Sequence, residues 1–270
     1  MAALQVDALF DVCGRVALVT GGSRGIGAVL AEALAVNGAK VYISSRKAEA
    51  CTRCAEAINA ECHRIKSPGR VIALPADLGT SEGVEQLASD FLKHERTCHI
   101  LINNAGATWG EPLETHPPAA FDKLLALNVR ACFHLVQKLL GALEADASAA
   151  RPSTVINIGS INGLGISLMD TYAYSASKAA IHHLTRVLAA QLAARHITVN
   201  AIAPGPFPTK MTAAVLASFE TEVVDRVPLR RVGKPSDLAG LCLLLTSPTG
   251  AYMTGTVIPV DGGSLVSPSL

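Results

Sequence analysis

Short apolar runs rich in β-branched residues alternate along this chain with longer segments in which apolar residues recur every three or four positions. The first pattern is typical of buried strands and the second of amphipathic helices. The predicted strands are residues 15–20, 40–44, 71–74, 100–102, 153–158, 197–203 and 255–260, and the predicted helices include residues 48–62, 119–140, 172–194 and 235–246. This alternation, without a linker or a charge run, predicts one α/β domain, residues 1–270, built on a parallel sheet.

The first predicted strand runs into a glycine-rich turn that is followed at once by a helical stripe of apolar residues. Gly21, Gly25 and Gly27 have the spacing G-x3-G-x-G. Such glycines let the backbone approach a pyrophosphate at a helix N-terminus, where free N–H groups favour anions. A tight turn without a ligand is the alternative, but the order of strand, turn and helix favours a dinucleotide site. The other residues of the turn that are predicted to contact the dinucleotide are Ser23, Arg24 and Ile26.

The end of the second predicted strand indicates which dinucleotide would bind. Folds that prefer NAD carry an acidic residue about 20 positions beyond the glycines, where it bonds the ribose 2′-hydroxyl. This chain has Ser45 and Arg46 there instead, and Arg24 lies inside the glycine turn. Two guanidinium groups suit the 2′-phosphate of NADPH through charge-assisted hydrogen bonds. The alternative is that Arg46 is a solvated residue at the start of a helix.

Candidate chemistry lies in the helix predicted for residues 172–194. Tyr174 and Lys178 are four residues apart, so their side chains share one helical face. A fixed cation beside a phenol favours the phenolate and makes the phenol a better proton donor near neutral pH. Ser160 directly follows the strand predicted for residues 153–158, at the end where open α/β sheets bind ligands. A Tyr–Lys pair alone also occurs on ordinary solvated helices. Other motifs in the chain are therefore needed to decide whether this pair is catalytic.

Two further strand ends carry polar or small residues. Asp77, beside Leu78, is placed to meet an adenine amino group, or alternatively to cap the helix that starts near Ser81. The fourth predicted strand ends in Asn-Asn-Ala-Gly, which presents amides and small side chains where a cofactor ribose would lie. The predicted cofactor contacts from this segment are Asn104, Ala105 and Gly106.

Asn128 lies between apolar neighbours in the helix predicted for residues 119–140. A buried amide must find hydrogen-bond partners. Its sequence position alone leaves two roles open, a structural bracket and a member of a proton relay.

Composition excludes several other classes. The net charge of +1 and the 17% of charged residues give no sign of a nucleic-acid partner. No run of about 18 uncharged apolar residues is present, so no membrane span is expected. The amino end, MAALQVDALFDV, has no basic segment typical of a secretory signal, and seven cysteines are an odd number. These features predict reduced thiols and a cytoplasmic location.

Cys51, Cys54 and Cys62, the last followed by His63, suggest a zinc site by their spacing. Cys51 and Cys54 share a helical face, however, where small thiols commonly pack as core. No second closely spaced pair completes a four-ligand set. Core packing is therefore the prediction, and no metal is expected.

Taken together, these motifs resemble the short-chain dehydrogenase/reductase family over almost the whole chain. The resemblance implies a Rossmann-type, doubly wound parallel sheet of about seven strands with helices on both faces, and a homotetramer or homodimer. It is strongest to the 3-oxoacyl reductases, including the NADPH-dependent branch of rhamnolipid synthesis, through GSRGIG, ATWG and AYMTG-x-VIP-x-DGG. The matching positions are Thr20, Gly21, Gly25, Gly27, Asp77, Leu78, residues 103–106, Asn128, Ser160, Tyr174, Lys178, Pro204, Gly205, Asp261 and Gly262.

The resemblance also implies roles for single residues. Tyr174 would protonate a carbonyl oxygen, and Lys178 would assist it and hold the nicotinamide ribose. Ser160 would bond the same oxygen, and Asn128 would anchor a water between Lys178 and solvent. Further cofactor contacts would come from Pro204, Gly205 and Phe207, at the start of a substrate lid spanning approximately residues 205–225. Tyr172 is expected to face elsewhere.

The activity implied is that of an NADPH-dependent carbonyl reductase, which converts a ketone or 3-oxoacyl compound to a secondary alcohol. Three alternatives stay open: a dedicated 3-oxoacyl-(acyl-carrier-protein) reductase, NAD-dependent alcohol oxidation, and an NADPH-binding redox sensor without turnover. The acidic residues Glu144 and Asp146, with Ala190 where carrier-protein users have arginine, argue against strong docking of an acidic carrier. Residues expected to line an apolar substrate pocket are Trp109, Leu164, Ile166, Leu168 and Met169.

Arg46→Ala should raise the Michaelis constant for NADPH by about tenfold and leave that for NADH almost unchanged, because only NADPH carries the 2′-phosphate. Initial-rate kinetics with both cofactors measure the effect. An equal loss with NADH and NADPH would show that Arg46 does not contact the 2′-phosphate.

Overall fold

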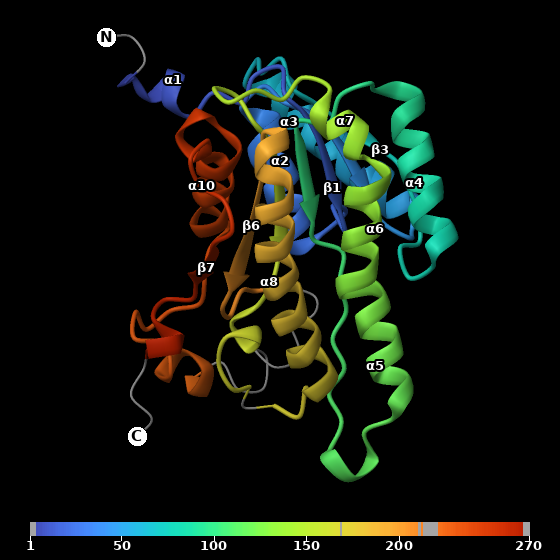
Figure 1. The fold of residues 1–270 in the computed structure, drawn as a ribbon. Helices are drawn as coiled ribbons and strands as arrows, with labels where there is room; N and C mark the ends of the chain where they lie inside the picture. Colours follow the sequence, from blue (N-terminus) through green and yellow to red (C-terminus); the bar gives the residue numbers. More distant parts are fainter. Residues whose placement is uncertain (1–3, 168, 210–211, 213–220, 267–270) are drawn as a thin grey trace.

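The computed structural model describes residues 4–167, 169–209, 212 and 221–266, and these form a seven-stranded sheet between two layers of helices (Figure 1). All strand pairs are parallel, and the spatial order is β3-β2-β1-β4-β5-β6-β7. The strands are β1 (Val16–Thr20), β2 (Lys40–Ser44), β3 (Arg70–Ala73), β4 (Ile100–Asn103), β5 (Ser153–Ile158), β6 (Ile197–Pro204) and β7 (Val257–Val260). The predicted Rossmann-type, doubly wound architecture is confirmed.

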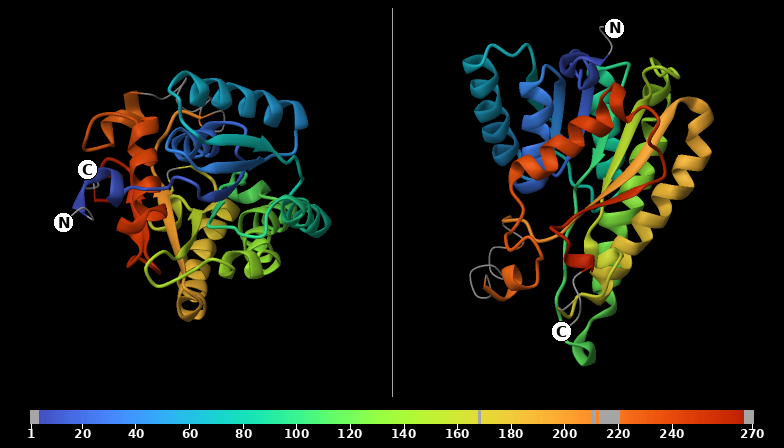
Figure 2. Two further views of the ribbon diagram at one scale, coloured as in Figure 1. Left: turned by 90° about the horizontal axis from the view of Figure 1, so that it is seen from above. Right: turned by 90° about the vertical axis from the view of Figure 1, so that its left-hand side faces the viewer.

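The helices connect successive strands and divide between the two faces of the sheet. They are α1 (Val6–Leu9), α2 (Gly25–Val36), α3 (Ala48–Arg64), α4 (Ser81–His94), α5 (Pro118–Leu125), α6 (Ala131–Lys138), α7 (Leu140–Glu144), α8 (Tyr172–Leu192) and α10 (Pro235–Thr246). Helices α4, α6 and α8 cover the near face in Figure 1, and α2, α3 and α10 cover the other (Figure 2).

Alternation along the strands explains these two layers. Ala17 and Val19 of β1 pack into the core shared with α2, α3 and α10, whereas Leu18 between them packs into the core shared with α4, α6 and α8. Both faces of a parallel sheet are buried, so the strands are continuously apolar instead of alternating with polar residues. The apolar runs in the sequence therefore mark strands that are covered on both sides.

Two predicted elements differ from the observed ones. The helix predicted for residues 119–140 is interrupted by a π-helical turn, Ala126–Arg130, which contains Asn128, and a further break at Leu139 separates α6 from α7. Apolar periodicity continues through such a turn, so the sequence pattern did not show it. The last strand begins at Val257 and not at residue 255, because Gly255 has a positive φ of 78°.

The amino ends of the central strands are held by a buried arginine. Arg15 is 4% exposed, and its Nη2 donates to the carbonyl oxygens of His99 at 3.2 Å and Pro152 at 2.6 Å. These residues directly precede β4 and β5, so one guanidinium joins the starts of three strands. Burial lowers the pKa of Arg15 to about 10, which still leaves it charged at neutral pH.

The opposite edge of the sheet carries the carboxyl ends of the strands, which point downward in Figure 1. From β1 the chain continues to β2 and β3 on one side of the sheet, and from β4 it continues to β5, β6 and β7 on the other side. The strand order therefore reverses between the neighbours β1 and β4. Open α/β sheets bind ligands in the crevice outside such a reversal. Among the described residues, no helix combines the length and the apolar character needed to span a bilayer.

Candidate active site

The glycine turn after β1 adopts a backbone that side chains would prevent. Gly21 and Gly25 have positive φ angles of 62° and 54°. A Cβ atom on Gly27 would lie 2.3 Å from Nδ2 of Asn104 and 2.4 Å from the carbonyl oxygen of Gly21. The turn therefore needs glycine for both conformation and space, and it places bare backbone at the N-terminus of α2.

Asn104 connects this turn to the loop after β4. Its Nδ2 donates to the carbonyl oxygens of Thr20 at 2.9 Å and Gly21 at 3.1 Å. In return, Oγ1 of Thr20 accepts the backbone N–H groups of Asn104 and Ala105, both at 3.0 Å. These four hydrogen bonds hold the two loops together at the strand-order reversal, where the sequence predicted cofactor contacts.

The predicted 2′-phosphate residues lie at the neighbouring strand end. The N–H of Gly22 donates to the carbonyl oxygen of Ser44 at 3.0 Å, which joins the glycine turn to the segment containing Ser45 and Arg46. Arg24 and Arg46 are exposed, and neither forms an ion pair with a residue that the structure describes. Both guanidinium groups are thus available to an anion.

Asp77 lies at the end of β3, as predicted, and it is exposed beside the buried Leu78. Its Oδ1 accepts the N–H of Gly79 at 3.0 Å. The cap of α4 is instead Thr80, whose side chain accepts the N–H of Gly83. The alternative that Asp77 caps this helix is therefore wrong.

The Tyr–Lys pair stands on the face of α8 that is turned toward β5. Lys178 is 6% exposed, and its Nζ lies 5.6 Å from the centroid of the Tyr174 ring. The same Nζ donates to the carbonyl oxygen of Ile158, the last residue of β5, at 2.7 Å. A Cβ atom on Gly106 would lie 3.8 Å from Nζ, so the ammonium also reaches the loop after β4.

Ser160 begins the 3₁₀ turn Ile161–Gly163, two residues beyond β5. It is 8% exposed, and its Oγ accepts the N–H of Asn162 at 3.2 Å. The hydroxyl hydrogen remains free to donate to a substrate oxygen. Ser160, Tyr174 and Lys178 therefore come from two consecutive elements that meet at the carboxyl edge of the sheet.

Asn128 is 2% exposed, and its amide forms a bracket between two other segments. Its Nδ2 donates to the carbonyl oxygen of Ala107 at 3.1 Å and to Oγ of Ser177 at 2.9 Å, and its Oδ1 accepts the N–H of Ala107 at 3.0 Å. These bonds join the loop after β4 to the residue that precedes Lys178. Of the two roles left open by the sequence, the side chain performs the structural one.

Tyr172, two residues before Tyr174, has different surroundings. It is 39% exposed, its hydroxyl donates to Oδ1 of Asp170 at 3.0 Å, and its ring contacts that of His116. The hydrogen bond to Asp170 raises the pKa of the Tyr172 hydroxyl. Tyr172 is therefore occupied away from Lys178.

The cysteines of α3 pack against the sheet and the cofactor turns. Cys51 and Cys62 are buried in the core, and burial raises the pKa of both thiols. Sγ of Cys54 lies 3.6 Å from the carbonyl oxygen of Gly22, inside the glycine turn. Their observed role is packing, as predicted.

The segment after β6 returns over the glycine turn. Gly205 packs against Asp261, where a Cβ atom would lie 2.7 Å from Cα of that residue. The Phe207 ring is buried, and its atoms fill the space beside Gly233. Thr209 reaches to within 3.6 Å of a Cβ built on Gly25. Most of the predicted lid, residues 210–211 and 213–220, lies outside the described residues.

Apolar side chains surround the entrance to this edge. Leu164, Ile166 and Met169 are 42%, 98% and 50% exposed in the segment between Ser160 and α8. Trp109 packs in a small cluster with Tyr174, and Nζ of Lys123 lies 5.1 Å from its ring centroid. Leu168 also belongs to the predicted pocket but lies outside the described residues.

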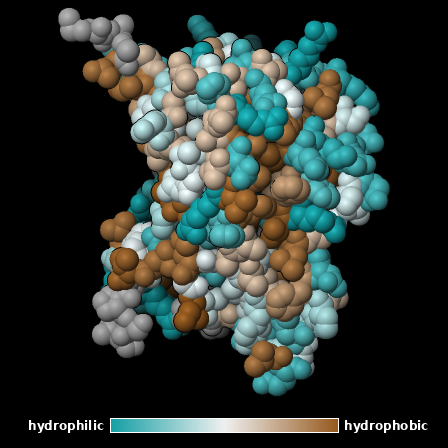
Figure 3. Space-filling model, in the orientation of Figure 1, coloured by the Kyte–Doolittle hydropathy of each residue, from teal (hydrophilic) through white to brown (hydrophobic). Residues whose placement is uncertain are grey.

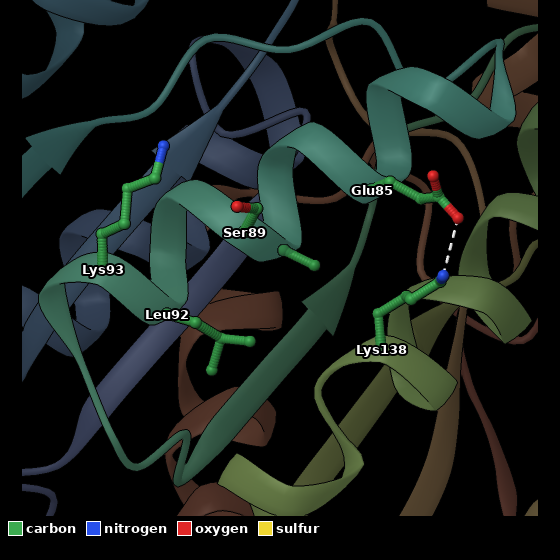
Figure 4. Close-up of a pocket in the computed structure, with 6 residues that line it drawn as sticks. Glu85, Ser89, Leu92, Lys93 and Lys138 are labelled. Carbon is green, nitrogen blue, oxygen red and sulfur yellow. Dashed lines mark hydrogen bonds and ion pairs between the residues drawn. The ribbon is translucent and has the colours of Figure 1, made fainter.

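A separate hollow of about 500 Å³ lies between α4 and α6 (Figure 4). Across it Nζ of Lys138 contacts Oε1 of Glu85 at 2.6 Å, with Leu92 and Lys93 along the rim. Both partners of this ion pair are substantially exposed. It is a surface groove lined by residues of α4 and α6, none of which belongs to the candidate site.

His182 is a buried residue at the site that the sequence interpretation missed. It lies one helical turn beyond Lys178, and its Nε2 accepts the backbone N–H of Ser160 at 3.4 Å. The i, i+4 spacing from Lys178 was the available signal, because it puts both side chains on one face of α8.

Comparisons with known proteins agree with this arrangement. A family model described as Enoyl-(Acyl carrier protein) reductase, adh_short_C2, matches residues 21–264. The chain is 44% identical over 256 residues to the rhamnolipids biosynthesis 3-oxoacyl-(acyl-carrier-protein) reductase of Pseudomonas aeruginosa, covering 94% of this chain and 97% of that protein. It is 35% identical to a 3-oxoacyl-(acyl-carrier-protein) reductase of Synechocystis, covering 93% and 97%. The solved NADP active-site complex of Pseudomonas aeruginosa RhlG has a TM-score of 0.89 at 43% identity, covering 95% of this chain and 98% of that one.

Asn128→Ala should lower the free energy of unfolding by roughly 2–4 kcal/mol, because it leaves the N–H and the carbonyl oxygen of Ala107 without the Asn128 amide and removes the donor to Oγ of Ser177. Asn37→Ala is the matched control at an exposed helix end, where a loss below about 1 kcal/mol is expected. Urea denaturation of both variants measures the difference. Equal losses would show that the bracket contributes little to stability.

Proposed function

The chain belongs to the short-chain dehydrogenase/reductase family and is an oxidoreductase, and from this premise we propose that it is an NADPH-dependent carbonyl reductase. It converts a ketone or 3-oxoacyl compound to a secondary alcohol. The observation that carries the proposal is the placement of Tyr174 and Lys178 on one face of α8, beside the turn of Ser160. The glycine turn opens at the same edge of the sheet.

The residues around the glycine turn fit NADPH. Gly21 and Gly27 leave no room for a Cβ, so bare backbone is presented for a pyrophosphate. Arg24 and Arg46 are exposed and suit a 2′-phosphate, and the segment after β2 has no carboxylate before Glu49, which pairs with Arg53. The NADP complex of the Pseudomonas relative supports the same cofactor. When bound, NADPH supplies a hydride to the carbonyl carbon.

Each remaining step belongs to a side chain of this protein. Tyr174 donates its phenolic proton to the carbonyl oxygen. Ser160 donates a hydrogen bond to that oxygen, where negative charge develops. Lys178 stabilises the phenolate that remains, because a nearby cation favours the charged form of an acid.

Lys178 also has donors to spare. An ammonium group carries three N–H donors, and the described residues accept one of them, through the carbonyl oxygen of Ile158. The other two are available to the hydroxyls of the nicotinamide ribose. Asn128 holds the loop and helix that frame this space, and its backbone lies in the π-helical turn where a water linking Lys178 to solvent would be anchored.

The apolar entrance favours a substrate with an alkyl or aryl arm. Leu164, Ile166 and Met169 expose apolar surface beside Ser160, and Trp109 packs near Tyr174. A dedicated 3-oxoacyl-(acyl-carrier-protein) reductase is the second candidate, and it is favoured by the Pseudomonas and Synechocystis relatives, which are both named for this activity. The acidic residues that the sequence offered against carrier docking do not bear on this choice: Glu144 pairs with Arg195 just before the starts of β5 and β6, at the amino edge of the sheet and away from the proposed site.

The substrate class is tested by comparing kcat/KM for acetoacetyl-coenzyme A with that for a simple aryl ketone or a β-keto ester, followed as NADPH oxidation. A strong thioester preference would support 3-oxoacyl reduction. A preference for free ketones would support a general carbonyl reductase. Strong preference for NADH as cofactor, or absence of turnover with every ketone, would contradict the proposed function.

Tyr174→Phe should lower kcat at least about 100-fold, because general acid catalysis contributes that much or more. NADPH affinity, measured by the fluorescence of the bound dinucleotide, should stay within about twofold. Tyr172→Phe is the matched control on the same helix and should keep most of the activity. Residual activity of Tyr174→Phe above a few per cent would contradict its role as the acid.

We also propose that the protein forms a homotetramer or homodimer in a reducing, cytoplasmic location. All seven cysteines are free. Leu125 of α5, Phe133 of α6 and Val187 of α8 are 39%, 39% and 45% exposed, and α5 packs against α8, so these side chains define an exposed apolar band along this face. Figure 3 shows apolar surface down the middle of the same view. Neighbouring apolar side chains on a surface are typical of protein contacts.

Phe133→Glu should shift the assembly to a smaller species, because it places a charge in this apolar band. Light scattering coupled to gel filtration measures the mass of each species. Leu92→Glu is the matched control, since Leu92 is 44% exposed on α4, away from the band. A monomeric wild type, or equal effects of both substitutions, would contradict an interface at this face.

A further inference from the structure

His182 is buried directly behind the turn that carries Ser160. It is 2% exposed, and Nε2 accepts the backbone N–H of Ser160 at 3.4 Å. The other ring nitrogen, Nδ1, is also buried and has no partner of good geometry among the described residues. The polar surroundings of the ring are the Ser160 N–H and the Gly163 backbone, and both belong to the turn that carries Ser160. A buried imidazole stabilises a fold less than an apolar side chain of the same size unless its nitrogens are satisfied, so its contacts point to this turn.

Two glycines allow the turn to press against this ring. A Cβ atom on Gly159 would lie 2.0 Å from Nε2 of His182. A Cβ atom on Gly163 would lie 2.5 Å from the carbonyl carbon of Lys178, on the backbone of α8. The turn between these glycines is therefore in direct contact with the helix, and the imidazole fills the space beneath Ser160.

The ring is neutral under ordinary conditions. Burial lowers the pKa of His182 to about 4, and a hydrogen bond with the Gly163 backbone raises it in part. The positive charges of Lys178 and Arg186 also lower this pKa. A neutral imidazole keeps one unprotonated nitrogen, and here Nε2 is the acceptor, so the proton is on Nδ1. A protonated ring would have no acceptor for the Ser160 N–H.

Three residues of α8 form hydrogen bonds with the chain at and just beyond the end of β5. Thr185 accepts the side chain of Asn157 at 2.9 Å, Lys178 donates to the carbonyl of Ile158 at 2.7 Å, and His182 accepts the N–H of Ser160. The spacing of four and three residues places all of them on one helical face. His182 supplies the contact that reaches beyond the strand to the reactive turn.

We propose that His182 is a positioning residue for Ser160: its imidazole holds the Ser160 backbone, and thereby the direction of the hydroxyl, toward the substrate oxygen. This inference rests on the proposed function of Ser160. The hydroxyl is separated from the backbone by one rotatable bond, and Oγ is already held by the N–H of Asn162. A change in the orientation of the Ser160 backbone therefore moves the hydroxyl directly, and misplacement by about 1 Å costs substantial rate.

The first test compares His182→Leu, which removes the acceptor, with His182→Gln, whose amide oxygen restores one. His182→Leu should lower kcat about tenfold with NADPH affinity within about twofold. His182→Gln should recover most of the loss. His183→Leu and His183→Gln are matched controls at the adjacent exposed position and should behave as wild type. An unchanged kcat in His182→Leu, or no recovery in His182→Gln, would overturn the proposal.

A double-mutant cycle separates positioning from general support of the fold. In the Ser160→Ala background, His182→Leu should cause less than about a twofold further loss of kcat, because its effect acts through the missing hydroxyl. An equal fractional loss in both backgrounds would mean that His182 only supports the fold. If His182→Leu does not fold, Gly159→Ala takes its place, since the added methyl group displaces the same ring.

A spectroscopic measurement keeps the inference distinct from the proposed activity. Histidine ¹⁵N resonances of the wild-type protein should show His182 neutral, with the proton on Nδ1, and His182→Gln should shift the Ser160 amide resonance. If wild type reduces no ketone but shows these signals, the proposed function fails while the contact stands. A cationic ring at neutral pH, or a proton on Nε2, would overturn the inference whatever the activity.

Discussion

The contact between α8 and the end of β5 is the interaction on which the rest of the candidate site depends. Lys178 is almost fully buried, yet its Nζ bonds the carbonyl oxygen of Ile158, so the ammonium is both anchored and desolvated. A buried charge is tolerated only with such partners. This bond joins α8 to the end of the strand, and Tyr174 lies one turn away on the same face of the helix. Ser160 comes directly after the same strand.

Hydrogen bonds between polar groups connect the loops on the two sides of the strand-order reversal, where the cofactor is expected. Asn104 and Thr20 exchange hydrogen bonds between the loops after β4 and β1, and Asn128 ties the continuation of the first loop to α8. Leaving one of these buried groups unpaired would cost about 1–3 kcal/mol. The arrangement therefore holds the glycine turn and the Tyr–Lys pair as one unit. A dinucleotide on the turn and a carbonyl near Tyr174 would face each other across it.

The candidate site has two parts, the polar groups at the strand ends and the apolar residues beside them. The phenol, the hydroxyl and the ammonium suit protonation of a carbonyl oxygen, and exposed arginines suit a phosphate. The apolar residues between Ser160 and α8 are separate from that chemistry, so in the proposed function they would select the ketone and not the reaction. The proposed function thus assigns substrate choice to these apolar residues and reaction type to the groups at the strand ends.

The amino-acid sequence by itself determined the parts of this protein that rest on local patterns. Apolar runs located all seven strands, glycine spacing located the turn, and Tyr174 and Lys178 were paired by helical spacing alone. What only the tertiary structure decided depends on contacts between distant segments. The π-helical turn at Asn128 keeps the apolar periodicity of an ordinary helix, so no sequence pattern marks it. His182 gains its position from Gly159 and Ser160, more than 20 residues away, and Cys54 from Gly22. Such contacts arise only when the sheet brings separate strand ends to one edge.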